Sequence, residues 1–159
     1  MKISIISVGK LKEKYLLDGI AEYIKRLSKF CIVEEIVLKD EPIPDKASKT
    51  IEEEIKIKEG KKIIASIPQN SYKIALDLKG AMLDSVELAN KILSIQTYNN
   101  SHIVFIIGGS LGLSREVIDN VDYKLCFSKM TFPHQLMKLI LVEQIYRSFK
   151  INNNETYHK

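Results

Sequence analysis

The sequence predicts a single α/β domain in which helices cover both faces of a mostly parallel sheet. Strand-like and helix-like segments alternate along the whole chain, which is typical of βα units. The chain has 159 residues and no linker-like stretch, so we expect one domain over residues 1–159. With 45% hydrophobic and 28% charged residues, the composition is that of a globular protein rather than a disordered chain.

Five segments are rich in β-branched and apolar residues and are predicted to be strands. The fourth is the most strand-like, and it leads directly into Gly108 and Gly109. Gly80 is expected to end the third. The five predicted strands are 2–8, 31–38, 72–78, 102–107 and 123–127.

Five further segments carry the apolar spacing or the end signals of helices. Ser48 or Thr50 is suited to cap the second helix, Ser114 the fourth, and Pro133 is expected in the first turn of the last. The predicted helices are 13–30, 48–67, 84–98, 114–120 and 133–151.

Several classes of protein are disfavoured by the residue pattern. The longest apolar run, Ile103–Ile107, is far shorter than the roughly 20 residues of a membrane span, and the N-terminus lacks a signal-peptide pattern, so we expect a cytoplasmic protein. Cys31 and Cys126 each lie within a strand-like run, so a disulfide or a zinc site is not expected. The three histidines lack the spacing of metal ligands, and we predict no metal.

Ligands of open α/β sheets bind beyond the carboxyl ends of the strands, which draws attention to the three loops after Leu78, Ile107 and Phe127. The glycine-rich loop 108–112 is either a tight turn or a cradle for a phosphate or nucleoside. The loop 127–134 holds Phe127, Met130 and Phe132, so it packs against the core or against an aromatic ligand.

The last helix is apolar nearly all round between residues 136 and 142, where only Lys138 interrupts. Because a terminal helix has one face against the sheet, its other face predicts a homodimer. Glu143 and Arg147 lie one turn apart on one side of this helix. They are either an ordinary ion pair or a polar site at the edge of the dimer interface.

Taken together, several short segments resemble the ribosomal large-subunit methyltransferase H family of SPOUT-type enzymes. The resemblance covers the whole chain, and all the segments occur in the family's order. They are Ile-Ser-Val-Gly-Lys (6–10), Ile-Ala-Leu-Asp (74–77), Gly-Gly-Ser-Leu-Gly (108–112), Phe-Ser-Lys-Met-Thr-Phe-Pro-His-Gln (127–135), Glu-Gln-Ile-Tyr-Arg (143–147) and Tyr-His-Lys (157–159).

The resemblance implies a C-terminal trefoil knot, a homodimer and S-adenosylmethionine as cofactor. It implies methylation of N3 of a pseudouridine in 23S rRNA on the assembled ribosome, and the net charge of +4 permits an RNA partner. The expected cofactor contacts are Leu76, Gly108, Phe127, Ser128, Lys129, Met130, Thr131 and Phe132. One departure is Asn154, where relatives often have glycine; Asn tolerates the left-handed backbone conformation that such a turn needs.

Catalytic roles are expected for His158, Arg147 and Glu143. His158 or Glu143 would accept the N3 proton, and we favour His158 with Arg147 at the uridine, with Glu143 orienting Arg147. Contacts to the RNA are expected from Tyr157, Lys159, Lys138 and His134. The alternative function is a non-catalytic α/β nucleotide-binding or ribosome-associated module.

Two mutational expectations follow from the sequence. Gly108→Val should abolish S-adenosylmethionine binding while leaving the fold intact, because the side chain would occupy space needed by the ligand. The polar tail 155–159 has no apolar pattern, so its removal should barely change stability.

Overall fold

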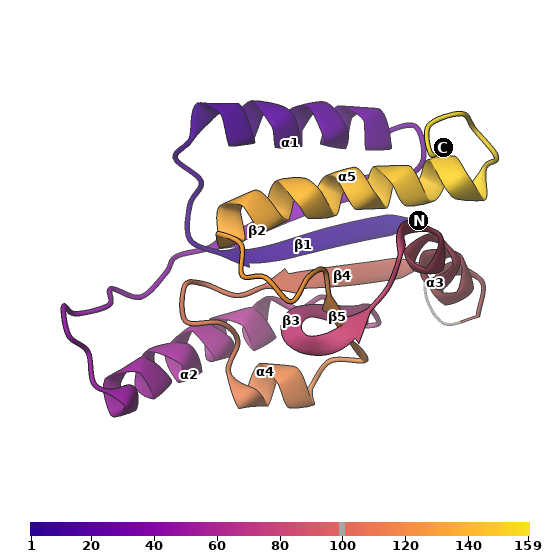
Figure 1. Cartoon of the computed structure of the whole chain (residues 1–159). Helices are drawn as coiled ribbons and strands as arrows, with labels where there is room; N and C mark the ends of the chain where they lie inside the picture. Colours follow the sequence, from indigo (N-terminus) through magenta and orange to yellow (C-terminus); the bar gives the residue numbers. More distant parts are fainter. Residues whose placement is uncertain (99–100) are drawn as a thin grey trace.

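A five-stranded parallel sheet forms the centre of the molecule, with strand order β2-β1-β4-β3-β5 (Figure 1). This computed structural model describes residues 1–98 and 101–159. The α/β class and the parallel sheet predicted from the sequence are therefore confirmed. The strands are β1 (Lys2–Val8), β2 (Ile32–Leu38), β3 (Tyr72–Met82), β4 (His102–Ile107) and β5 (Tyr123–Cys126).

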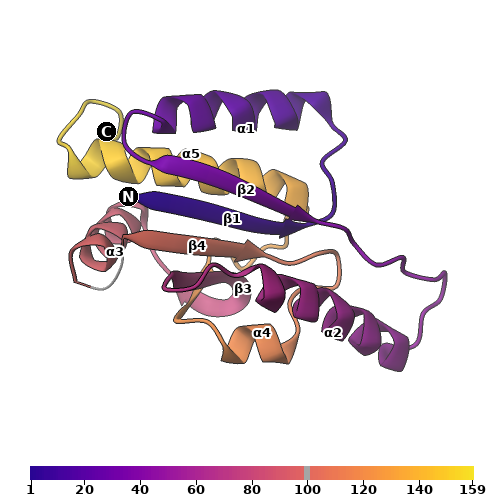
Figure 2. The same cartoon turned by 180° about the vertical axis from the view of Figure 1, so that it is seen from behind.

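Helices cover both faces of this sheet, as the sequence predicts. On one face α5 lies between α1 and α3 and packs against both, and α2 and α4 lie together on the other face (Figure 1). Seen from behind, β2 runs along the edge of the sheet (Figure 2). The helices are α1 (Lys14–Leu27), α2 (Lys49–Ser66), α3 (Ser85–Tyr98), α4 (Arg115–Asp119) and α5 (His134–Asn152).

Alternation along the central strands divides the core into two layers. Ile103 and Phe105 of β4 join the larger core under α1, α3 and α5, whereas Val104 and Ile106 join the smaller core under α2 and α4. Successive side chains of a strand point to opposite faces, so a strand covered on both sides is apolar throughout. This explains why 102–107 is the most strand-like segment of the sequence.

Helix ends follow the sequence signals closely. Ser48 caps α2 by accepting from the Ile51 amide at 3.3 Å, and Ser114 caps α4 by accepting from the Val117 amide at 3.4 Å. Pro133 is the residue before α5 rather than part of its first turn. Asn154 follows α5 with a φ of +54°, so the left-handed turn expected at this position is formed.

The end predicted for β3 is wrong. The strand continues to Met82, but Leu76 and Ala81 both lie opposite Leu125 of β5, so residues 77–80 leave the ladder as an outward excursion. Gly80 allows the chain to return, because a Cβ there would lie 2.6 Å from the Lys124 carbonyl carbon. Glycine marks a close approach of two backbones here and not a strand end.

Within the described residues, no helix combines the length and apolar character needed to cross a bilayer. No group of three or more His, Cys, Asp or Glu side chains in that part of the chain is placed to hold a metal ion. Cys31 and Cys126 are buried and unbonded to each other, and burial raises the pKa of the Cys31 thiol to about 11.

Candidate active site

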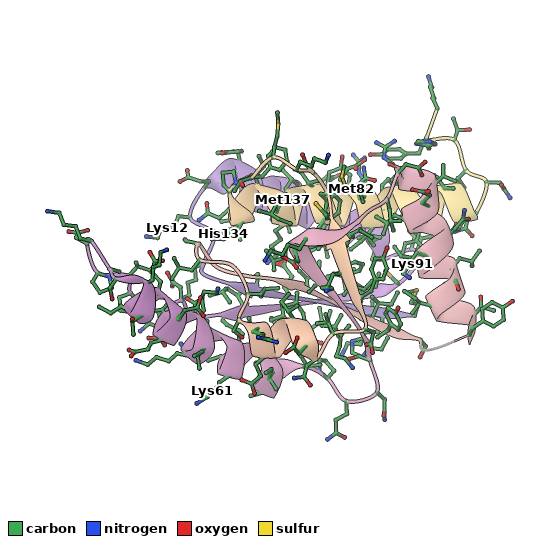
Figure 3. The ribbon with its side chains drawn as sticks, turned by 60° about the horizontal axis from the view of Figure 1, so that its bottom comes forward. Lys12, Lys61, Met82, Lys91, His134 and Met137 are labelled. Carbon is green, nitrogen blue, oxygen red and sulfur yellow. The ribbon has the colours of Figure 1, made fainter. Side chains whose placement is uncertain are left out.

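A cavity of about 810 Å³ opens at the carboxyl edge of the sheet. It is lined by residues 76–78 within β3, by the segments at the ends of β4 and β5 and the loops after them, and by the first turn of α5. Figure 3 labels His134 and Met137 on that turn and Met82 at the end of β3. The loops predicted after β4 and β5 therefore meet at one place, because parallel strands present their carboxyl ends to the same edge. The third part of the wall comes from residues 76–78, which still belong to β3, and not from a loop after Leu78.

Most of the expected cofactor residues line this cavity. Lys129 is the exception, since it is exposed and does not contribute to the wall. His134, expected from sequence at the RNA, is also part of the lining. The lining members of the expected set are Leu76, Gly108, Phe127, Ser128, Met130, Thr131 and Phe132.

The glycine-rich loop 108–112 folds back on itself in the cavity wall. A Cβ at Gly108 would lie 2.8 Å from the Gly112 carbonyl carbon, closer than such atoms pack. Gly112 has a φ of +84°, a conformation that favours glycine. The expectation that a side chain at Gly108 would spare the local fold is therefore wrong, because it would first collide with the loop's own backbone.

The loop 127–133 packs against the core and also faces the cavity. Phe127 contacts the larger core and lines the cavity, whereas the side chain of Met130 is 72% exposed. Local hydrogen bonds hold the loop: the Cys126 thiol donates to the Ser128 carbonyl at 3.1 Å, and the Met130 amide donates to Ser128 Oγ at 3.0 Å. The alternative of packing against the core is therefore confirmed for Phe127, and packing of the loop against an aromatic ligand stays a prediction.

A second polar cluster lies near the other end of α5 and contains the expected catalytic residues. Glu143 Oε1 accepts from Arg147 Nη2 at 2.6 Å and from Arg147 Nε at 3.1 Å. His158 Nδ1 lies 3.3 Å from Arg147 Nη1. The hydrogen bond to Glu143 raises the pKa of Arg147 further, so the guanidinium keeps its charge.

Tyr157 fastens the tail to this cluster. Its hydroxyl donates to Glu143 Oε1 at 3.0 Å and lies 3.4 Å from the hydroxyl of Tyr23. Its ring packs edge-on against Tyr146, with the ring centroids 4.9 Å apart. Burial and these hydrogen bonds raise the pKa of Tyr157 well above its usual range, so the phenol stays a donor.

The tail is thus anchored, contrary to the expectation that it lacks fixed contacts. Tyr157 is engaged by protein groups, which leaves His158 and Lys159 as the exposed end of the chain. Sequence reasoning missed Tyr23 of α1, which no motif connects with a residue 134 positions away. The helical spacing in α1 indicates only that Tyr23 lies toward the core side.

Lys138 does not lie where an RNA contact would need it. Its side chain is 2% exposed, and its ammonium lies 2.7 Å from Glu35 Oε2 beneath α5. The side chain interrupts the apolar run because it reaches under the helix to the sheet, where Ser7 Oγ is 3.5 Å away. We therefore drop Lys138 as an RNA ligand and assign it to holding α5 on β1 and β2.

Within one chain the cavity and the Glu143 cluster lie apart. His134 and Arg147 are 13 positions apart on the same helix, which corresponds to about 20 Å at the usual rise per residue. Figure 1 shows the tail at one end of α5 and the preceding loop at the other. The structure therefore groups the expected cofactor residues with one another and the expected catalytic residues with one another, but it does not bring the two groups together in a single chain.

The fold and these two clusters define the class of protein. A family model described as a predicted SPOUT methyltransferase matches residues 1–158, and the chain belongs to this family. The chain is accordingly an enzyme, a methyltransferase, and the alternative of a non-catalytic module is set aside.

Two similar proteins are named as methyltransferases of ribosomal RNA. The chain is 58% identical over 159 residues to the ribosomal RNA large subunit methyltransferase H of Alkaliphilus oremlandii (strain OhILAs), and the alignment covers 100% of both proteins. It is 57% identical, again over 100% of both chains, to the ribosomal RNA large subunit methyltransferase H of Clostridioides difficile (strain 630).

A solved structure, of a probable methylase family protein from Haemophilus influenzae Rd KW20, has a related fold. The TM-score is 0.51 at 14% identity, over 99% of this chain and 70% of that one. This likeness concerns the fold alone.

Proposed function

We propose that the protein transfers a methyl group from S-adenosylmethionine to N3 of a pseudouridine in the 23S rRNA of assembled ribosomes. The full-length similarity to proteins named for the RNA of the large ribosomal subunit supports this substrate. The observation that carries the proposal is the cavity at the carboxyl edge, where residues 76–78 of β3 meet the loops after β4 and β5.

The cavity suits this cofactor in size and in the character of its wall. A volume of about 810 Å³ lies within the range of small-molecule sites, roughly 300–1,000 Å³. Leu76, Phe127 and Phe132 offer apolar surface to an adenine ring, and the backbone of Gly108 lies in the wall. A Cβ at Gly112 would meet no atom within 4 Å, so this backbone is open to close approach.

When bound, S-adenosylmethionine supplies a methyl group already activated by a sulfonium. The protein's task is then mainly to position the acceptor nitrogen and to deal with its proton. Arg147 is suited to stabilise the anion that forms when N3 of the pseudouridine loses that proton. Glu143 orients the guanidinium through its two hydrogen bonds.

The contact between His158 and Arg147 determines which ring nitrogen of His158 is available. A guanidinium can only donate, so Nδ1 is the acceptor and the proton of a neutral imidazole lies on Nε2. In this arrangement His158 can donate from Nε2 to a uracil carbonyl oxygen. Because Nε2 already carries a hydrogen, His158 accepts the N3 proton only on Nδ1, and only after Nδ1 has left Arg147.

A homodimer would unite the two clusters. Leu136, Met137 and Ile140 are half-buried on the side of α5 that continues to Glu143 and Arg147, and the described helices α1 and α3 pack elsewhere on α5. A two-fold axis across α5 would align two copies of the helix antiparallel. The tail of one protomer would then lie beside the cavity of its partner, with Lys159 and His134 facing the RNA.

The same path of the chain supports the trefoil knot implied by the resemblance. β5 pairs with β3 at the edge of the sheet, and the chain then returns to place α5 between α1 and α3. We propose that this return passes through the loops after β3 and β4.

The decisive experiment is transfer of labelled methyl groups to ribosomes from a strain that lacks the enzyme, followed by mapping of the modified base. We expect one labelled pseudouridine in the 23S rRNA. Label in another RNA, or on protein, would contradict the proposed substrate. A parallel assay with free 23S rRNA tests the requirement for assembly. We expect methyl transfer to intact ribosomes and little or none to the free RNA.

The dimer is tested by Ile140→Asp, because a charge buried between two α5 helices is costly. Light scattering should give twice the 18.2 kDa chain mass for the unmodified protein and a lower mass for the variant. Ile57→Asp is the matched control, since Ile57 is 45% exposed on α2, away from this face. A monomeric mass for the unmodified protein would contradict the dimer.

A further inference from the structure

We propose that Asp77 is the counter-ion for the positive charge of the methyl donor, so that the cavity selects a cationic adenosine derivative over a neutral one. The inference rests on the proposed function, because it takes S-adenosylmethionine as the ligand of the cavity. It adds a residue that determines which form of the ligand is preferred.

Asp77 provides the only carboxylate among the described residues that line the cavity. No lysine or arginine belongs to that lining, and its other polar members are hydroxyl, amide, thiol and imidazole groups. The wall is otherwise formed by apolar side chains and glycine backbone. A single negative charge in such surroundings favours a ligand that carries a positive charge.

Among the described residues, the carboxylate of Asp77 has no partner. It makes no hydrogen bond or ion pair with any residue of ranges 1–98 and 101–159, although its side chain is half-buried. Other acids of the fold are engaged: Glu59 accepts from the Glu41 amide at 3.0 Å, and Asp122 accepts from the Lys73 amide at 2.7 Å. Because a partly desolvated carboxylate gains from a cation, a ligand is the missing partner.

The excursion of β3 is what brings Asp77 to the cavity. Leu76 still pairs with Leu125, and Asp77 is the first residue to leave the ladder. The excursion closes at Gly80, which lies so near Lys124 that any side chain would displace it. A bulge of this kind commonly re-aims a side chain next to a site, and here it places a charge at the end of a buried strand.

S-adenosylmethionine offers two positive groups, the sulfonium and the α-ammonium. S-adenosylhomocysteine keeps the ammonium and lacks the sulfonium charge, and 5′-methylthioadenosine has neither. These three ligands share the adenosine group that the apolar wall would hold. Comparing them separates the charge contribution from the shape of the cavity.

Isothermal titration calorimetry of the three ligands tests the proposal on the unmodified protein, on Asp77→Asn and on Asp119→Asn. Asp119 is a control of the same chemistry, since its side chain is 63% exposed on α4 and pairs there with Arg115. We expect Asp77→Asn to weaken S-adenosylmethionine about five- to tenfold, as for loss of one partner in a partly buried charge pair. Binding of 5′-methylthioadenosine should be unchanged, and Asp119→Asn should change neither.

The pattern of losses identifies the charge that Asp77 faces. A loss confined to S-adenosylmethionine assigns the sulfonium, and a loss shared with S-adenosylhomocysteine assigns the ammonium. Equal weakening of all three ligands, or of none, would overturn the proposal. If the unmodified protein does not bind S-adenosylmethionine, the proposed cofactor is wrong. If the unmodified protein binds it and Asp77→Asn binds it equally well, only the role of Asp77 is wrong.

Discussion

Deleting residues 157–159 is expected to lower the stability of the protein as well as its methyl-transfer activity. Tyr157 joins the tail to three aromatic or acidic partners: Glu143, Tyr23 and Tyr146. All three belong to α1 or α5, so the tail also ties these two helices together. A terminus with only polar, exposed residues would have no such effect.

The size of the effect can be estimated from these contacts. A hydrogen bond to a carboxylate contributes about 1–2 kcal/mol when the pair is partly solvated. The edge-on contact with Tyr146 adds about 0.5–1.5 kcal/mol. A total of about 1.5–3.5 kcal/mol corresponds to a fall in Tm of about 3–14 °C for a chain of this length.

Thermal unfolding followed by circular dichroism, at equal protein concentration, checks this estimate. Tyr157→Phe keeps the ring and should lose only the hydrogen-bond share, about 1–2 kcal/mol. Removal of Lys159 alone is the control, because this residue is exposed at the end of the chain. If the protein truncated at 156 melts within about 1 °C of the full chain, Tyr157 is not an anchor and the estimate is refuted.

Three other perturbations test separate parts of the structure. Gly108→Ala should lower both the stability of the protein and its affinity for S-adenosylmethionine, because the added Cβ would lie 2.8 Å from the Gly112 carbonyl carbon. Denaturant titration measures the stability and calorimetry the affinity. Full stability with lost affinity would contradict this expectation. Urea unfolding should show a loss of about 3–5 kcal/mol for Glu35→Gln and about 1–2 kcal/mol for Lys138→Met. Glu35→Gln leaves the charge of Lys138 buried without its partner, whereas Lys138→Met leaves Glu35, which is 33% exposed and can be hydrated. Burial, and then Lys2, lower the pKa of His102, so its neutral form stabilises the fold above the unfolded pKa near 6.5. That stability should be lost as pH falls below 6.5, and His102→Gln should remove this part of the pH dependence of unfolding free energy; parallel curves for the two proteins would contradict it.

The sequence alone determined the order and type of the elements. The β-branched runs, the serine caps of α2 and α4 and the apolar spacing of the helices are local signals, and each acts within a few residues. The two cavity loops after β4 and β5 were also predictable, because parallel strands send their carboxyl ends to one edge. Of the segments that resemble the methyltransferase family, 108–112 and 127–135 contribute to those loops and 157–159 forms the tail.

Tertiary structure decided the features that depend on contacts between distant parts of the chain. Lys138 could be recognised as an interruption of an apolar run, but only the position of Glu35 on β2 shows that it is a buried partner of the sheet. Tyr157 meets Tyr23 across 134 positions, and residues 77–80 leave the ladder and return where Gly80 approaches Lys124. The physical reason is common to all three: local propensity and periodicity fix the direction of a side chain relative to its own element, whereas its partner is fixed by how the elements pack.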